Sequence, residues 1–172
     1  MAGKSAAFRV EHDLLGEKKV PASAYYGIQT LRGMENFAIS GVALCRYPDF
    51  IRALAMVKMA AARANHDSKN LPRKVLKGIE AACADLMEGK LHEEFQLDVF
   101  QGGAGTSTNM AANEVIANRA LEHMGHRRGE YEYCDPHDHV NLAQSTNDAY
   151  PTALHIAFVL GALQARRAEL EL

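Results

Sequence analysis

A stretch near the end of the chain, from Ala153 to Leu163, is apolar on nearly every side when it is drawn as a helix. Only His155 and Gly161 interrupt it. A helix on a protein surface needs one apolar stripe, whereas a helix that is apolar all round is buried among others. The stretch is shorter than the roughly 20 residues that a membrane-spanning helix needs. It therefore predicts a helix in the middle of a helical bundle, with Pro151 at the first helical position.

Two earlier stretches have one apolar face each and predict a helical hairpin. The first helix is expected to start after Asp49 as its N-cap and to end before Asn70. The second is expected to begin with Pro72 in its first turn and to end at Gly89, which suits a left-handed C-cap. The apolar positions are Phe50, Ile51, Leu54, Val57, Ala61 and Ala64 in the first helix, and Val75, Leu76, Ile79, Cys83, Leu86 and Met87 in the second.

The remaining segments are less regular. Residues 1 to about 48 are rich in glycine and proline, so we expect only turns and short strands there. Apolar and polar residues alternate from Phe95 to Phe100, but the segment is too short to distinguish a strand from an extended loop.

Composition excludes several classes of protein. The chain has 172 residues, 48% of them hydrophobic, and a net charge of −2, which is typical of a soluble globular chain and not of a nucleic-acid-binding one. Three widely spaced cysteines predict neither a disulfide framework nor a zinc ribbon, and they favour a reducing cytoplasm. The polar start, from Met1 to Val10, is unlike a signal peptide, and no segment is long enough to span a membrane.

Two short polar runs share one chemical character. Residues 102–109 read Gly-Gly-Ala-Gly-Thr-Ser-Thr-Asn, and residues 144–148 read Gln-Ser-Thr-Asn-Asp. Both offer hydroxyl and amide donors, without a charged base or a set of metal ligands. Donors of this kind bind carboxylates and stabilise negative charge that develops on them. The runs therefore predict two walls of one anion pocket.

Each run is expected to lead into the N-terminus of a helix. Residues 106–124 are rich in alanine and predict a helix with Thr106 or Ser107 as its N-cap and Gly125 as its stop. The second run precedes the helix predicted at Pro151. The free amides and the positive end of the helix dipole favour a bound anion by about 0.3–1 kcal/mol.

Simpler explanations exist for both runs. The glycine-rich run could be only a tight turn before a capped helix, and the segment Ser145–Asp148 could be an ordinary N-cap cluster. A dinucleotide or phosphate site is disfavoured, because the third glycine of the G-x-G-x-x-G pattern is missing and no Gly-Lys-Ser/Thr ending follows.

Other polar residues outside the runs suggest weaker hypotheses. The close histidine pairs, His123 with His126 and His137 with His139, lack a third ligand at suitable spacing, so we expect no metal site. Lys58, on an otherwise apolar helix, could bind a carboxylate, as could Arg32. A surface or interface ion pair is the expectation we prefer for Lys58 and Arg32.

Beyond these physical arguments, the motifs resemble the aspartase branch of the aspartase/fumarase superfamily. The resemblance rests on Gln-Gly-Gly-Ala-Gly-Thr-Ser at 101–107, Asn-Met at 109–110, Asn-Glu-Val at 113–115 and Gln-Ser-Thr-Asn-Asp at 144–148. It extends to Asp-Leu-Leu-Gly at 13–16, Val-Pro at 20–21, Ala-Tyr-Tyr-Gly at 24–27 and Thr-Leu-Arg at 30–32. It covers essentially the whole chain, which looks like the first third of such an enzyme.

The resemblance implies a mainly α fold in two parts. Residues 1–141 would form the N-terminal domain, with short strands or turns at its start. Residues 142–172 would form the Ser-Thr-Asn loop and the first long helix of the central bundle, and the chain would end inside that helix. Family members are homotetramers whose active sites form where three subunits meet, so the two runs would meet across chains.

The implied reaction is the reversible deamination of L-aspartate to fumarate and ammonia through an enediolate-like intermediate, with no cofactor. Thr106, Ser145 and Thr146 would hold the β-carboxylate, with Ser107 close by, and Asn147 together with Thr106 would contact the amino group. The base in the family is a serine on a downstream loop, and no Gly-Ser-Ser-x-Met-Pro-x-Lys-x-Asn run occurs in this sequence.

Two alternatives remain open at this stage. One is a fumarate hydratase or another fumarate-releasing lyase, although the Gly-Gly-Ala-Gly-Thr-Ser and Ser-Thr-Asn forms favour an aspartase. The other is a non-enzymatic helical binding module. The segment Asp135–His139 aligns with a loop that forms a secondary anion site in fumarases, but the leading His and the Asn are replaced, so we expect a solvated turn.

Overall fold

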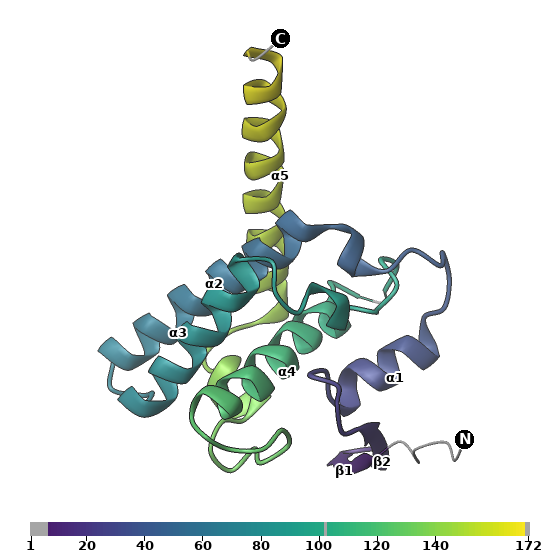
Figure 1. Cartoon of the computed structure of the whole chain (residues 1–172), viewed down its shortest axis with the longest axis vertical. Helices are drawn as coiled ribbons and strands as arrows, with labels where there is room; N and C mark the ends of the chain where they lie inside the picture. Colours follow the sequence, from purple (N-terminus) through teal and green to yellow (C-terminus); the bar gives the residue numbers. More distant parts are fainter. Residues whose placement is uncertain (1–6, 102, 171–172) are drawn as a thin grey trace, which may run out of the picture.

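The computed structural model describes residues 7–101 and 103–170 of the chain, and it is mainly helical (Figure 1). The elements in chain order are β1 (Phe8–Asp13), β2 (Gly16–Pro21), α1 (Ile28–Asn36), the 3-10 helix η1 (Leu44–Arg46), α2 (Pro48–Asp67), α3 (Arg73–Met87), the 3-10 helix η2 (His92–Glu94), α4 (Thr106–His123), the π-helical turn η3 (Pro136–Val140) and α5 (Thr146–Leu170). The expected fold class, with short strands at the start, is confirmed.

The strands β1 and β2 form one antiparallel hairpin in which Phe8 pairs with Pro21 and Asp13 with Gly16. Gly16 has a φ of +106°, a backbone conformation that favours glycine, and it closes the turn. Arg9 ties the hairpin to the following loop, because its guanidinium donates hydrogen bonds to the backbone carbonyls of Pro21, Ala24 and Tyr26.

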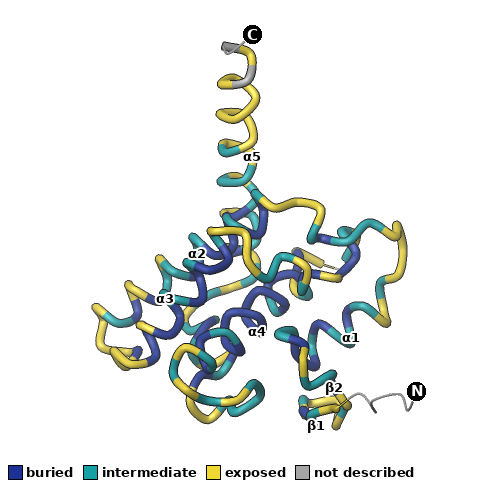
Figure 2. Tube along the Cα trace, in the orientation of Figure 1, coloured by how far each residue is buried: buried dark blue, intermediate teal, exposed yellow. Residues whose placement is uncertain are grey.

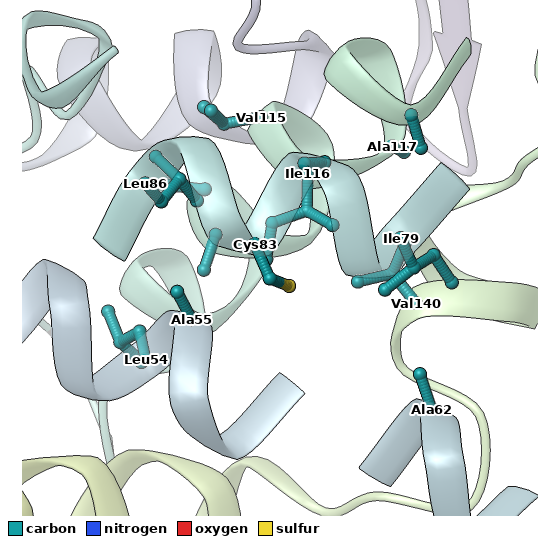
Figure 3. Packing of buried hydrophobic residues seen from close by; sticks show 14 of the residues in the cluster. Leu54, Ala55, Ala62, Ile79, Cys83, Leu86, Val115, Ile116, Ala117 and Val140 are labelled. Atoms are coloured by element: carbon teal, nitrogen blue, oxygen red, sulfur yellow. The ribbon is translucent and has the colours of Figure 1, made fainter. Parts of the chain in front are cut away.

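The predicted hairpin of α2 and α3 is confirmed, and α4 packs across α3 (Figure 1). Figure 3 shows the buried side chains where these helices meet, including Leu54, Cys83 and Ile116. The predicted stripe of α3 lies inside this core, apart from Met87, which is only partly buried. Gly89 ends this helix and Gly125 follows α4, both with left-handed backbone as expected.

Helix α4 is the helix of this chain that is buried on nearly all sides (Figure 2). Alanines let its neighbours approach closely, and its buried positions also include polar side chains. These are Thr108, Asn109, Asn113, Glu114 and Asn118. Buried polar groups must be hydrogen-bonded to be tolerated, so this helix carries an internal polar network as well as the core.

Helix α5 differs from the prediction in its start and in its surroundings. It begins at Thr146, so Pro151 lies inside the helix and not at its first position. Ser145 causes the earlier start, because its Oγ accepts a hydrogen bond from the Asn147 amide at 3.2 Å and caps the helix. The helix packs on α2, where Gln164 Nε2 still donates to Asp49 Oδ1 at 3.3 Å, and its C-terminal part projects away from the other elements (Figures 1 and 2).

The prediction that residues 153–163 are buried in a bundle is therefore wrong for this chain taken alone. Ala153 is buried, but Phe158 is 68% exposed, Val159 59% and Leu163 55%. An all-round apolar helix needs neighbours on every side, and the described residues supply them on one side only.

Two predicted N-caps are also corrected. Helix α2 starts at Pro48, so Asp49 lies within the first turn, where its carboxylate pairs with Arg52 at 2.9 Å. Helix α4 is preceded by Gly105 with a φ of +83°, and neither Thr106 nor Ser107 occupies the capping position. The side chain of Gln101 replaces a cap there, because its Oε1 accepts from the Thr108 amide at 2.8 Å.

The segment from Phe95 to Phe100 is an extended loop with a single bridge between Ala43 and Asp98. Phe95 and Leu97 are fully buried, which explains their alternation with polar residues. The Asp98 carboxylate gathers the backbone amides of residues 39–41. Backbone hydrogen bonds join the loop to residues 42–45 as well, so it holds the segment that leads into η1 and α2.

Helix α1 has no counterpart in the predictions, because its N-terminus is capped from another helix. Gly27 precedes it and has no side chain to cap it. The carboxylate of Glu114, on α4, instead accepts from the amides of Gly27, Gln29 and Thr30 at 2.8–3.0 Å and from the Thr30 hydroxyl at 2.6 Å. Burial raises the pKa of Glu114 to about 7, while these four hydrogen bonds lower it.

Candidate functional site

The two donor runs lie side by side in one chain, at the starts of α4 and α5. The Asn109 Nδ2 atom, at the end of the first run, donates to Thr146 Oγ1 in the second at 3.1 Å. Gly105 and Tyr150 are also in contact, because a Cβ atom added to Gly105 would overlap the Tyr150 ring. The expectation that the runs meet only across chains is therefore wrong for these residues, although it stays a prediction for the complete pocket.

The first run presents donors at the N-terminus of α4. Thr106 is exposed and Ser107 is half-buried. Within the described part of the chain, the amides of Thr106 and Ser107 have no hydrogen-bond acceptor, whereas the next amide is taken by Gln101. Gly102 lies outside the described residues. Amides with no acceptor among the described residues, together with two hydroxyls, at the positive end of a long helix form a surface suited to an anion.

The second run presents its donors at the N-terminus of α5. Ser145 and Asn147 are exposed, and Thr146 is half-buried. The Ser145 hydroxyl accepts from the Asn147 amide, so the simpler explanation of an N-cap is correct for Ser145. A capping hydroxyl still has its own hydrogen to donate, so the capping role and a ligand-binding role are compatible.

Beneath the hydroxyl donors lies a largely buried polar cluster that the sequence analysis did not predict, although two of its members belong to the runs. We call it the Lys58 cluster, and it consists of Lys58, Asn109, Asn113, Asn141 and Gln144. Lys58 Nζ donates to Asn141 Oδ1 and to Gln144 Oε1, each at 3.0 Å. Asn141 Oδ1 also accepts from Asn109 Nδ2 at 3.0 Å and from Asn113 Nδ2 at 3.2 Å. The cluster connects α2, α4 and the loop before Ser145.

Lys58 was expected in a surface or interface ion pair, and that expectation is wrong. The residue is 0% exposed, and its partners are neutral amides. Burial lowers the pKa of Lys58 to about 7, because an ammonium group loses its hydration inside the protein. The expectation is confirmed for Arg32, whose guanidinium pairs with the Asp13 carboxylate at 2.7 and 2.8 Å.

The lowered pKa of Lys58 predicts a pH-dependent stability. Between pH 7 and the ordinary lysine pKa of 10.5, Lys58 is protonated in the unfolded chain and neutral in the folded one. The unfolded state then binds more protons, so the contribution of Lys58 to stability increases as pH rises across this range. A tenfold difference in proton affinity between the two states corresponds to about 1.4 kcal/mol, so the contribution changes by several kcal/mol across the range.

Lys58→Met in the full-length protein checks this expectation. The melting temperature of the variant, relative to the unaltered protein, should be highest near pH 7 and should decline toward pH 10. An equal difference between the two proteins at every pH would show that Lys58 does not titrate in this range.

The histidines make contacts that do not involve metal ligation. His123 Nε2 lies 2.8 Å from an oxygen of Asp85, and the ring of His126 stacks on Tyr133 at 3.7 Å between centroids. His139 Nδ1 accepts from the Asp135 amide. Among residues 7–101 and 103–170, no group of three His, Cys, Asp or Glu side chains is placed to hold a metal ion.

The segment that aligns with a fumarase anion site forms the π-helical turn η3. Asp135 caps this turn by accepting from the amides of His137 and Asp138 at 2.6 and 2.7 Å. Both of these residues are exposed, in keeping with the expected solvated turn. No helix in the described ranges is long and apolar enough to cross a lipid bilayer.

Comparison with known proteins identifies the class. A sequence model for a family described as lyase matches residues 16–169. The chain belongs to this lyase family. That assignment argues against the alternative of a non-enzymatic binding module.

Among individual proteins, the chain is similar to aspartate ammonia-lyases. The chain is 59% identical to an aspartate ammonia-lyase from Pseudomonas fluorescens, over 91% of this chain and 33% of that protein. It is 55% identical to an aspartate ammonia-lyase from Escherichia coli K12, over 87% of this chain and 31% of that protein. The chain thus spans about a third of the length of the curated relatives it matches.

Solved structures show the same N-terminal fold. A fumarate lyase:delta crystallin from Brucella melitensis, in native form, has a TM-score of 0.92 at 56% identity, covering 94% of this chain and 38% of that one. A class II fumarase from Schistosoma mansoni has a TM-score of 0.80 at 37% identity, covering 88% of this chain and 32% of that one.

Proposed function

We propose that the full-length protein catalyses the reversible deamination of L-aspartate to fumarate and ammonia. This chain would supply the groups that hold the substrate. The observation that carries the proposal is the pair of helix N-termini whose donor runs lie side by side. Similarity to aspartate ammonia-lyases supports the choice of substrate.

The chemistry explains why neutral donors suit this reaction. Removing the weakly acidic C3 proton of aspartate places a second negative charge on the β-carboxylate. Donors that are already oriented stabilise this charge more strongly than they stabilise the ground state, which lowers the barrier. In the proposal, Thr106, Ser145 and Thr146 hold the β-carboxylate with Ser107 nearby, and Asn147 together with Thr106 contacts the amino group.

The base would come from outside this chain, as the serine loop of the family. Hydroxyl groups of serine and threonine need an activating partner to remove a proton, and the two runs contain no such base. We therefore expect no turnover from residues 1–172 alone. Fumarate absorbance at 240 nm that persists after complete removal of full-length enzyme would overturn the assignment of an external base.

Substitution of Thr146 by valine in the full-length enzyme tests the carboxylate-binding role. Valine has nearly the same shape but no hydroxyl, so we expect kcat/KM for aspartate to fall about 100- to 1000-fold, as for other donors of developing negative charge. Thr152→Val is the matched control, because Thr152 lies in the same helix and its hydroxyl donates to Asp148, which has no assigned role in holding the substrate. Equal losses from the two variants would remove Thr146 from the site.

A fumarate hydratase is the second candidate, and the similarity to the Schistosoma mansoni fumarase supports it. The two reactions release fumarate from different substrates, so the full-length protein should be assayed for ammonia release from aspartate and for hydration of fumarate. Ammonia release is the expected activity. Hydration without deamination would replace the proposed function by the alternative.

The proposal includes a homotetramer in the cytoplasm. Support for the assembly comes from α5, whose exposed apolar side chains include Phe158, Val159 and Leu163. An apolar hollow of about 620 Å³ beside it is lined by residues of η1, α2 and α5. Exposed apolar surface of this kind is covered by other segments in a stable protein.

A further inference from the structure

The hydroxyl of Thr146 has a defined hydrogen-bond direction in this structure. Its Oγ1 accepts from Asn109 Nδ2 at 3.1 Å. A hydroxyl group has one hydrogen to donate and lone pairs that accept. Since Asn109 occupies a lone pair, the hydroxyl hydrogen points elsewhere, and in the described residues it has no acceptor. That hydrogen is therefore available to a bound ligand.

This direction requires Asn109 to present its NH₂ group, and Asn141 ensures that it does. Asn109 Nδ2 lies 3.0 Å from Asn141 Oδ1, which can only accept. The Asn141 amide cannot be reversed at low cost, because its Nδ2 donates at 3.2 Å to the backbone carbonyl of Gln144. A backbone carbonyl has no hydrogen to give in return.

Lys58 also favours this orientation of the Asn141 amide. Its Nζ donates to Asn141 Oδ1 and to Gln144 Oε1. The Gln144 side chain is itself oriented, because its Nε2 donates to the Val140 carbonyl at 2.8 Å. The NH₂ group of each amide therefore donates to an oxygen that can only accept, and this fixes the orientation of the amide.

Burial makes this arrangement costly to change. Lys58 is 0% exposed, and Asn109 is 1% exposed. Reversing the Asn109 amide would set its Oδ1 atom against Asn141 Oδ1, and two buried acceptors facing each other have no hydrogen to share.

We infer that Asn141 and Asn109 form a directional chain of hydrogen bonds, supported by Lys58, that keeps the Thr146 hydroxyl oriented as a donor toward a ligand carboxylate. Asn109 and Asn141 are positioning residues in this scheme. The inference rests on the proposed function, since it assigns the means by which one donor of the carboxylate pocket is oriented.

The structure offers a matched control in Asn113, one turn further along α4. Its Nδ2 donates to the same Asn141 Oδ1, at 3.2 Å, and it is equally buried. Its other hydrogen bond among the described residues is with the sulfur of Met110, and none is formed with Thr146. Replacement of Asn113 therefore disturbs the same cluster without altering the bond to the hydroxyl.

A double-mutant cycle in the full-length enzyme tests the inference. Asn109→Ala and Asn113→Ala are each measured with Thr146 intact and in the Thr146→Val background. We expect Asn109→Ala to lower kcat/KM for aspartate roughly tenfold when the hydroxyl is present and less than about twofold when it is absent, because contacting residues are coupled. Asn113→Ala should have the same effect in both backgrounds.

A second readout separates this inference from the reaction itself. The same cycle is run on the Kd of succinate, a dicarboxylate that cannot undergo elimination. Coupling between positions 109 and 146 in succinate binding, in a protein without lyase activity, would refute the proposed reaction and support the inference.

If Asn109→Ala fails to fold, Asn109→Asp replaces it, with Asn113→Asp as control. A carboxylate at position 109 accepts from the Thr146 hydroxyl and so reverses the direction of that hydrogen bond. Independent effects of positions 109 and 146, or equal coupling for position 113, would overturn the inference.

Discussion

Replacing Glu114 by alanine is expected to detach helix α1 from the rest of the protein, at a cost of about 3–5 kcal/mol. The substitution removes the carboxylate that accepts from three backbone amides and from the Thr30 hydroxyl. Glu114 is 2% exposed, so water cannot replace it. Glu114→Gln should cost less, because one amide oxygen can still accept hydrogen bonds while the negative charge beside the helix N-terminus is lost.

Hydrogen exchange of the α1 amides measures this effect locally. A loss of 3–5 kcal/mol corresponds to at least about 100-fold faster exchange in α1, since each 1.4 kcal/mol is a factor of ten. Glu132→Ala is the control, because Glu132 is exposed and its loss should stay within about 0.5 kcal/mol. Unchanged protection of α1 in the Glu114→Ala variant would show that Glu114 does not hold the helix.

Substitution of Gly105 by alanine is expected to separate the two donor runs. Gly105 has a φ of +83°, which costs a residue with a Cβ roughly 1–2 kcal/mol. The added methyl group would also overlap the ring of Tyr150, and overpacking of this kind costs roughly 1–3 kcal/mol more. The Tyr150 ring packs edge-on against Phe50, so its displacement extends to the start of α2.

Gly103→Ala provides the comparison, because Gly103 also has a positive φ, of +66°, but a Cβ there would meet no atom of the described residues within 4 Å beyond its chain neighbours. It should incur only the backbone cost of roughly 1–2 kcal/mol. Thermal unfolding and kcat/KM of the two full-length variants should therefore differ, with the larger losses for Gly105→Ala. Equal losses would mean that the contact with Tyr150 has no part in positioning the runs.

Much of the helical fold could be predicted from local patterns. The apolar spacing in α2 and α3 identified the hairpin, and Gly89 and Gly125 marked helix ends, because left-handed backbone selects glycine. Apart from the missed helix α1 and the exposed face of α5, the errors were at helix starts. Asp49 and Thr106 have side chains that are typical of caps, but Pro48 and Gly105 decided where the helices begin.

The candidate site was predictable only at its surface. The two runs could be recognised from their composition, because the hydroxyl and amide groups next to glycine are the hydrogen-bond donors that an anion pocket needs. The Lys58 cluster had no comparable signal, because a single lysine on an apolar helix resembles an exposed residue. Its partners Asn141 and Gln144 lie 83 and 86 positions away, and no local pattern connects them to it.

The amino-acid sequence by itself determined that α2, α3, α4 and α5 are helical, which of their faces are apolar and which two runs carry neutral donors. Those properties depend on residues close together along the chain. Only the tertiary structure decided that Glu114 caps α1, that Lys58 is buried among amides and that Asn109 orients Thr146. The physical reason is that burying a polar group costs free energy unless it has a partner, and folding supplied most of those partners from distant parts of the chain.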